Sequence, residues 1–116
     1  MMDFSHKNVL VVGVGISGNA VAKVAKMQGA DKVVLSDAKA EQDLKYDLTD
    51  VRAAGVELVF GPQKNTLLDN VDMVILSPAV PVRIPLVQEA YKREIPVVSE
   101  VQVAYELAKS PILAVT

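Results

Sequence analysis

The sequence predicts an α/β fold in which a mostly parallel, doubly wound sheet carries helices on both faces. Short runs of Val, Leu and Ile alternate with segments of helical spacing along the whole of the 116 residues. Hydrophobic residues make up 51% of the chain and aromatic residues only 4%. Such an aliphatic core suits parallel strands that are buried on both faces. The connections between successive runs are short, as they are in βαβ units.

The first half of the chain is predicted to hold three strands and two helices. Aliphatic runs predict strands over residues 8–12, 32–36 and 56–60. The first helix, which Gly29 closes as a C-terminal cap, follows from the helical spacing of Ile16, Ala20, Val21, Val24 and Met27. A weaker helix that ends near Gly55 follows from Leu44, Leu48 and Val51.

The second half is predicted to begin with a polar, turn-like segment, Gly61 to Asn70, with one helical turn around Thr66 to Leu68. Strands follow over residues 72–76 and 96–98. Between them, Pro85 occupies the first position of a helix that runs to about Arg93, since a missing N–H costs nothing there. Ser99 begins the last helix, because Gln102 three residues later gives a capping-box spacing.

The end of the chain predicts a domain boundary. Residues 112–116 have the pattern of a sixth strand, yet no crossover helix follows them. We therefore expect the natural protein to continue. Ser110 and Pro111 mark the expected boundary, with a nucleotide-binding domain over residues 1–110 and the first strand of another domain over residues 111–116.

Composition excludes several classes of function. Net charge is −2 and the basic residues are scattered, which argues against a nucleic-acid or anionic membrane surface. The absence of cysteine excludes disulfides, thiolate metal sites and cysteine nucleophiles. With no signal peptide or membrane-spanning stretch in the sequence, we expect a cytoplasmic protein.

No set of residues in the sequence predicts catalysis or a metal site. There is no Ser/His/Asp set, no paired carboxylates and no metal-ligand spacing. His6, near the start of the chain, is expected to be exposed to solvent. Glu100 and Glu106 on the last helix are expected to be solvated rather than catalytic.

The residues from Gly13 to Gly18 fit the pattern G-x-G-x-x-G between a predicted strand and a predicted helix, as in Rossmann-like sheets. The first glycine permits the tight turn, Gly15 lets a phosphate approach the backbone, and the last lets the helix pack closely on the strand. Free N–H groups and the helix dipole would then face a diphosphate, with the Ser17 hydroxyl as a further donor. The alternative is a glycine turn that serves packing only.

Two further segments are predicted at the same edge of the sheet. Asp37 closes the second strand 19 residues after Gly18, where a carboxylate can accept hydrogen bonds from ribose hydroxyls. Alternatively, Asp37 starts a turn or caps the next segment. The loop from Ser77 to Pro81 follows the fourth strand, and it either covers a ligand or is a rigid turn.

Together these segments resemble the N-terminal region of the Mur ligase family, and most closely its MurD branch, which adds D-glutamate. The resemblance covers essentially the whole chain. It rests on the order and spacing of V-V-G-V-G-I-S-G at residues 11–18, L-S-D at 35–37, L-S-P-A-V-P at 76–81, V-S-E at 98–100 and I-L-A-V-T at 112–116.

The resemblance implies a domain that holds the UDP part of UDP-N-acetylmuramoyl-L-alanine. Gly15, Ile16, Ser17 and Gly18 would face the diphosphate. Asp37, with Ala38 and Lys39 beside it, would face the uridine. The loop from Ser77 to Val80, which includes Pro78 and Ala79, would close over the nucleoside. This sequence departs from the family at Ala79, where glycine is usual, and at Lys39, where some relatives carry arginine.

The resemblance also implies a larger enzyme of peptidoglycan precursor synthesis. Its central and C-terminal domains would use ATP and Mg²⁺ to form an acyl phosphate on the alanine carboxylate, which D-glutamate then attacks. The present chain would hold no cofactor and would not be catalytic alone.

Two other functions fit the glycine turn. The first is an NAD(H)-binding module of an oxidoreductase or a regulatory sensor, since Asp37 would also suit the adenosine ribose. NAD(H) binding would not explain the Ser-Pro loop or the final strand. The second is a domain whose nucleotide site has decayed and which serves as an assembly surface.

Overall fold

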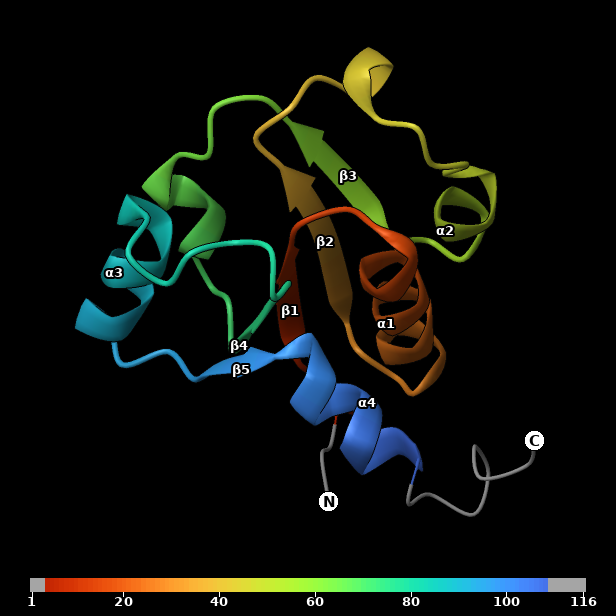
Figure 1. Cartoon of the computed structure of the whole chain (residues 1–116). Coiled ribbons are helices and arrows are strands. Elements are labelled where there is room, and N and C mark those ends of the chain that lie inside the picture. The colour runs from red at the N-terminus through yellow and green to blue at the C-terminus, as the bar shows by residue number, and fades with distance from the viewer. Residues whose placement is uncertain (1–3, 109–116) are drawn as a thin grey trace.

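The computed structural model describes residues 4–108. Strands and helices alternate along the chain as the sequence predicts (Figure 1). In order they are β1 (Asn8–Val12), α1 (Ile16–Met27), β2 (Lys32–Asp37), η1 (Glu41–Asp43), α2 (Thr49–Ala53), β3 (Glu57–Phe60), η2 (Asn65–Leu68), β4 (Met73–Leu76), α3 (Pro85–Lys92), β5 (Val97–Ser99) and α4 (Glu100–Ala108). The predicted sixth strand, over residues 112–116, and the predicted boundary at Ser110 and Pro111 lie outside the described residues.

The five strands form one sheet in the order β3-β2-β1-β4-β5, and every pair is parallel. β1 lies in the centre, with β2 on one side and β4 on the other. The chain moves outward from β1 through β2 to β3 and then returns to the opposite side of β1 as β4. The strand order therefore reverses beside β1, and the crevice at the carboxyl ends of β1 and β4 is the place where doubly wound sheets bind ligands.

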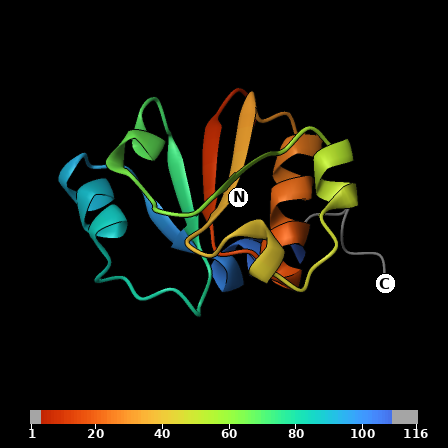
Figure 2. The ribbon, with the colours of Figure 1, turned by 90° about the horizontal axis from the view of Figure 1, so that it is seen from above.

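Helices cover both faces of the sheet, as predicted (Figures 1 and 2). Alternate residues of β1 belong to different layers of the core. Val9 and Val11 pack with α1, α2 and α4, whereas Leu10 and Val12 pack with η2 and α3. Because both faces are buried, the strand is a continuous apolar run rather than an alternating one.

The predicted strand boundaries agree with the structure to within one residue, but the predicted helix through Leu44 is wrong in its first half. Leu44 has an extended backbone (φ −91°, ψ 141°) after the short helix η1, and α2 begins only at Thr49. The Asp47 carboxylate accepts a hydrogen bond from the Thr49 N–H at 2.9 Å, which fixes the start of α2 locally. Leu48 nevertheless packs in the core, which explains the helix-like spacing.

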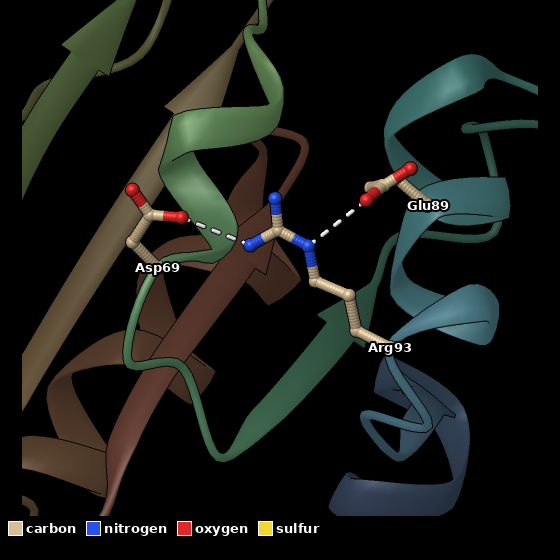
Figure 3. A network of polar contacts seen from close by, with 3 residues as sticks. All are labelled: Asp69, Glu89 and Arg93. Atoms are coloured by element: carbon tan, nitrogen blue, oxygen red, sulfur yellow. Dashed lines mark hydrogen bonds and ion pairs between the residues drawn. The ribbon is translucent and has the colours of Figure 1, made fainter.

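Arg93 links η2 to α3, the two elements that cover the face of the sheet formed by Leu10 and Val12 (Figure 3). Its Nη1 donates to Asp69 Oδ1 at 2.9 Å, just after η2, and its Nε donates to Glu89 Oε2 of α3 at 3.0 Å. These hydrogen bonds raise the pKa of Arg93 above its ordinary value. The guanidinium thus links η2 to the end of α3, at a distance from the carboxyl edge of the sheet.

Within residues 4–108, no helix has the length and apolar character that crossing a membrane requires.

Candidate functional site

The glycine turn lies at the carboxyl ends of three neighbouring strands. The Gly13 N–H donates to the Ser36 carbonyl at the end of β2 (2.8 Å), and the Ser77 N–H after β4 donates to the Val12 carbonyl (3.0 Å). These bonds place the turn between β2 and β4, beside the point where the strand order reverses. The segments predicted from sequence to share one edge of the sheet therefore do so.

Gly13 meets both a conformational and a steric demand. Its φ of +104° lies in the region that favours glycine. A Cβ atom added there would lie 2.7 Å from Ser77 Cβ and 3.1 Å from Val80 Cγ2. The loop after β4 thus packs directly on the glycine turn. The sequence pattern predicted the tight turn but not this second contact.

Gly18 and Gly15 differ in what surrounds them. A Cβ atom on Gly18 would lie 2.4 Å from the Gly13 carbonyl oxygen, which confirms that this glycine permits close packing of α1 on the turn. A Cβ atom on Gly15 would meet nothing within 4 Å. Its φ of −174° is extended backbone that any residue adopts. The protein's own packing therefore leaves open space beside the backbone at Gly15.

The start of α1 presents N–H groups without acceptors inside the helix. The first helical bond runs from the Asn19 N–H to the Gly15 carbonyl at 2.9 Å. The N–H groups of residues 16–18 come before this bond and therefore have no acceptor within the helix. Among the described residues, no side chain caps this helix end. Ile16 and Ser17 are exposed, whereas Gly18 is buried. With the positive end of the helix dipole, this arrangement is suited to bind an anion.

Asp37 ties the glycine turn to β2. Its Oδ2 accepts a hydrogen bond from the Val14 N–H at 2.9 Å, and its Oδ1 accepts one from the Lys39 N–H at 2.9 Å. The second bond confirms that Asp37 starts the following turn. Each carboxylate oxygen can accept more than one hydrogen bond, so a ligand hydroxyl can still be bound. That role stays a prediction, as do those of Ala38 and Lys39, which are exposed beside it.

The loop after β4 forms a compact turn of its own. The Val80 N–H donates to the Ser77 carbonyl at 2.9 Å, and the Ala79 N–H approaches Ser77 Oγ at 3.4 Å. Ser77 is half-buried, while Pro78 and Ala79 are exposed. The structure confirms the rigid turn; closure over a nucleoside stays a prediction.

The expectation that Glu100 is solvated is wrong. Glu100 is only 3% exposed, its Oε1 has no hydrogen-bond partner, and burial raises the pKa of its carboxyl group. Glu100 is the first residue of α4, which begins directly after β5, and it packs against the start of α1. A Cβ atom added to Gly18 would lie 3.2 Å from Glu100 Oε1. The sequence signal that could have indicated this burial is the position of Glu100 just after the predicted strand. Glu106 is half-buried, and His6 is exposed as predicted.

A cavity of about 300 Å³ lies between α1, the loop after β4 and α4. It brings two residues predicted from sequence, Ser17 and Pro78, together with Glu100. Asp37, Ala38 and Lys39 lie on the β2 side of the glycine turn instead. Within residues 4–108, no group of three or more His, Asp or Glu side chains could hold a metal ion. The start of α1 makes this arrangement suited to bind an anion.

Comparison with known proteins gives concordant results. The family described as "Mur ligase MurD-like, N-terminal domain" matches residues 7–99. UDP-N-acetylmuramoylalanine–D-glutamate ligase of Pelotomaculum thermopropionicum is 42% identical over 116 residues, which is all of this chain and 25% of the relative. The enzyme of the same name from Thermoanaerobacter sp. is 37% identical over 115 residues, which is 99% of this chain and 25% of the relative.

A solved structure shares the fold. UDP-N-acetylmuramate-alanine ligase MurC from Thermotoga maritima superposes with a TM-score of 0.68 at 26% identity, covering 90% of this chain and 23% of that one. The chain therefore spans about a quarter of the length of the relatives that it matches. These relatives favour the ligase interpretation of the glycine turn over the NAD(H)-binding one. The chain belongs to the family of MurD-like N-terminal domains of the Mur ligases.

Proposed function

We propose that this domain anchors the UDP part of UDP-N-acetylmuramoyl-L-alanine on the glycine turn. The observation that carries the proposal is the start of α1, where uncapped N–H groups and open space at Gly15 coincide beside the point of strand reversal. Anions bind at such helix starts because the donors and the dipole act together. The relatives are named as ligases of UDP-N-acetylmuramoylalanine and D-glutamate, which supports this choice of substrate.

Each part of the ligand is assigned to one segment of the edge. Residues 15–18 bind the diphosphate through backbone N–H groups and the Ser17 hydroxyl. Asp37, Ala38 and Lys39 bind the uridine, and Ser77, Pro78 and Ala79 close over the nucleoside. The methyl group of Ala79, where the family usually has glycine, brings side-chain bulk to that contact.

The domain works as one part of a larger, cytoplasmic ligase. Since the relatives are about four times longer, we assign ATP, Mg²⁺ and D-glutamate to central and C-terminal domains of the same chain. The complete enzyme would join D-glutamate to the alanine carboxylate in peptidoglycan precursor synthesis.

Thermal melting of the chain with UDP, UDP-N-acetylmuramoyl-L-alanine, NAD and ATP in parallel tests the proposal. A ligand at 100 times its Kd stabilises the folded state by about 2.7 kcal/mol, enough to raise the melting temperature by several degrees. We expect a rise with the two uridine ligands alone. A rise with NAD alone would overturn the proposal in favour of a nicotinamide module, and no rise with any ligand would favour a decayed site.

A further inference from the structure

The carboxyl group of Glu100 is unusual in the described part of the chain because it is an ionisable group that is buried. It lies at the first position of α4, 3% exposed, and its Oε1 has no hydrogen-bond partner. A buried carboxylate without a partner is unfavourable in its charged form. The group borders the cavity between α1, the loop after β4 and α4. It is therefore a titratable group held next to the glycine turn by the fold.

Among residues 4–108, no cation compensates this carboxyl group from the elements packed against it. The cavity is lined only by uncharged neighbours, namely Ser17, Ala20, Val21, Pro78, Val101 and Ala104. On α1, Lys23 lines a different pocket, against α2, and Lys26 Nζ donates to the Asp31 carbonyl at 3.1 Å. β4 and β5 contain no ionisable side chain.

The other titratable groups of these segments do not lie in the cavity. Arg83 belongs to the exposed loop that follows β4, and Tyr105 and Glu106 lie further along α4. On the opposite side of the glycine turn, Asp37 adds a second carboxylate, bonded to the Val14 N–H. The start of α1 thus has one acid on each side before any anionic ligand arrives.

The distance between Glu100 and the proposed diphosphate position is short. Oε1 is 3.2 Å from where a Cβ of Gly18 would stand, and Gly18 belongs to the turn whose N–H groups face the ligand. A diphosphate bound there would lie close enough to repel a charged Glu100. An approaching anion would therefore favour the protonated form of the carboxyl group.

We propose that Glu100 is a positioning residue whose carboxylate takes up a proton from solvent when the diphosphate binds, so that ligand affinity and the protonation of Glu100 are coupled. This inference rests on the proposed function. In the protonated state, Glu100 packs against Gly18 as a neutral group and leaves the positive end of α1 to the ligand. In the charged state, it competes with the ligand for that end of the helix.

The sign of the coupling follows from linkage. The bound state holds the proton more tightly than the free state, so the pKa of Glu100 is higher in the complex. Affinity is therefore highest at low pH, where Glu100 is protonated in both states. It falls as pH rises from the free-state pKa to the bound-state pKa, by up to about tenfold per pH unit. Above that window it is constant again.

Titration calorimetry with UDP-N-acetylmuramoyl-L-alanine tests the coupling. Both ends of this diphosphate are esterified, so it does not titrate in the range used, about pH 5 to about pH 9. Binding measured in two buffers with different ionisation enthalpies gives the number of protons taken up. We expect the wild-type chain to take up as much as one proton within the window. Zero proton uptake across the range would overturn the coupling without requiring any variant.

Variants assign the proton to one residue. In E100Q, which keeps the shape of the side chain and removes its charge, we expect no proton uptake and an affinity independent of pH. E106Q on the same helix is the matched control and should keep the wild-type pH profile. A purely structural Glu100 predicts weaker binding in E100Q with an unchanged pH slope, which would contradict the proposal.

Failure of the coupling and failure of the proposed function give different results. Binding of the uridine ligand with the same pH profile in wild type and E100Q would overturn the coupling alone. No binding of any uridine ligand at any pH would overturn the proposed function and the coupling with it.

Discussion

At the scale of single residues, the three glycines of the turn meet different demands. Gly13 needs a positive φ and space for Ser77, and Gly18 needs space for the Gly13 carbonyl oxygen. Gly15 needs neither in the free protein, because its backbone is extended and its surroundings are open. A glycine that packing does not require is the one whose replacement best tests a ligand role.

The pair G18A and G15A separates packing from binding. A Cβ on Gly18 would lie 2.4 Å from a backbone oxygen, so we expect G18A to lower the free energy of unfolding by about 1–3 kcal/mol. G15A should lower it less, by about 0.5–1 kcal/mol, since no atom lies within 4 Å of the added Cβ and the only expected cost is the preference for glycine over alanine at a helix N-cap. Denaturant unfolding measures both.

Binding gives the second half of this test. If the phosphate approaches the backbone at Gly15, its affinity for G15A should fall about tenfold or more. Equal affinity of G15A and wild type for UDP would show that no phosphate lies against this residue.

Residue roles could be predicted from sequence only where a motif defines them. The spacing of G-x-G-x-x-G gives Gly13 and Gly18 their roles in turn and packing, and the structure agrees. The contact of Gly13 with Ser77 and the burial of Glu100 depend on which strands lie side by side. Which strands are neighbours cannot be predicted from local sequence. From sequence alone, a glutamate at the start of a helix is expected to be solvated and stabilised by the helix dipole.

At the scale of elements, local signals predicted boundaries well where a cap or a proline defines them. α3 begins at Pro85, as predicted, and Ser99 Oγ accepts a hydrogen bond from the Gln102 N–H at 3.0 Å, as the capping-box spacing predicted. The predicted helix through Leu44 is wrong because the spacing of Leu44, Leu48 and Val51 does not require all three to be helical. Leu44 has an extended backbone, Leu48 is buried just before α2, and Val51 is buried within α2.

The cap at Ser99 predicts a measurable contribution to α4. We expect S99A to lower the free energy of unfolding by about 1 kcal/mol, because the Gln102 N–H loses its acceptor. S99D supplies an alternative acceptor and should recover most of this loss. Denaturant unfolding of the three proteins provides the comparison, and equal stability of S99A and wild type would mean that water replaces the cap at no cost.

At the scale of the whole molecule, the order of the strands determines where a ligand can bind. The alternation of strands and helices predicts parallel pairing, but it does not by itself predict that β4 returns beside β1. The order β3-β2-β1-β4-β5 brings the turn after β1 against the loop after β4. The sequence predicted only that these two segments share the carboxyl edge of the sheet, and the match over residues 7–99 confirms the family.

The central claim is that a uridine diphosphate ligand binds at the carboxyl edge of the sheet on the glycine turn. The most direct measurement is an NMR titration of the isotope-labelled chain with UDP-N-acetylmuramoyl-L-alanine, following each backbone amide. The account predicts the largest shifts at residues 15–18, with further shifts at 37–39, 77 and 79. Shifts confined elsewhere, such as the groove at the opposite edge lined by Asn8, Lys32 and Thr66, would contradict it.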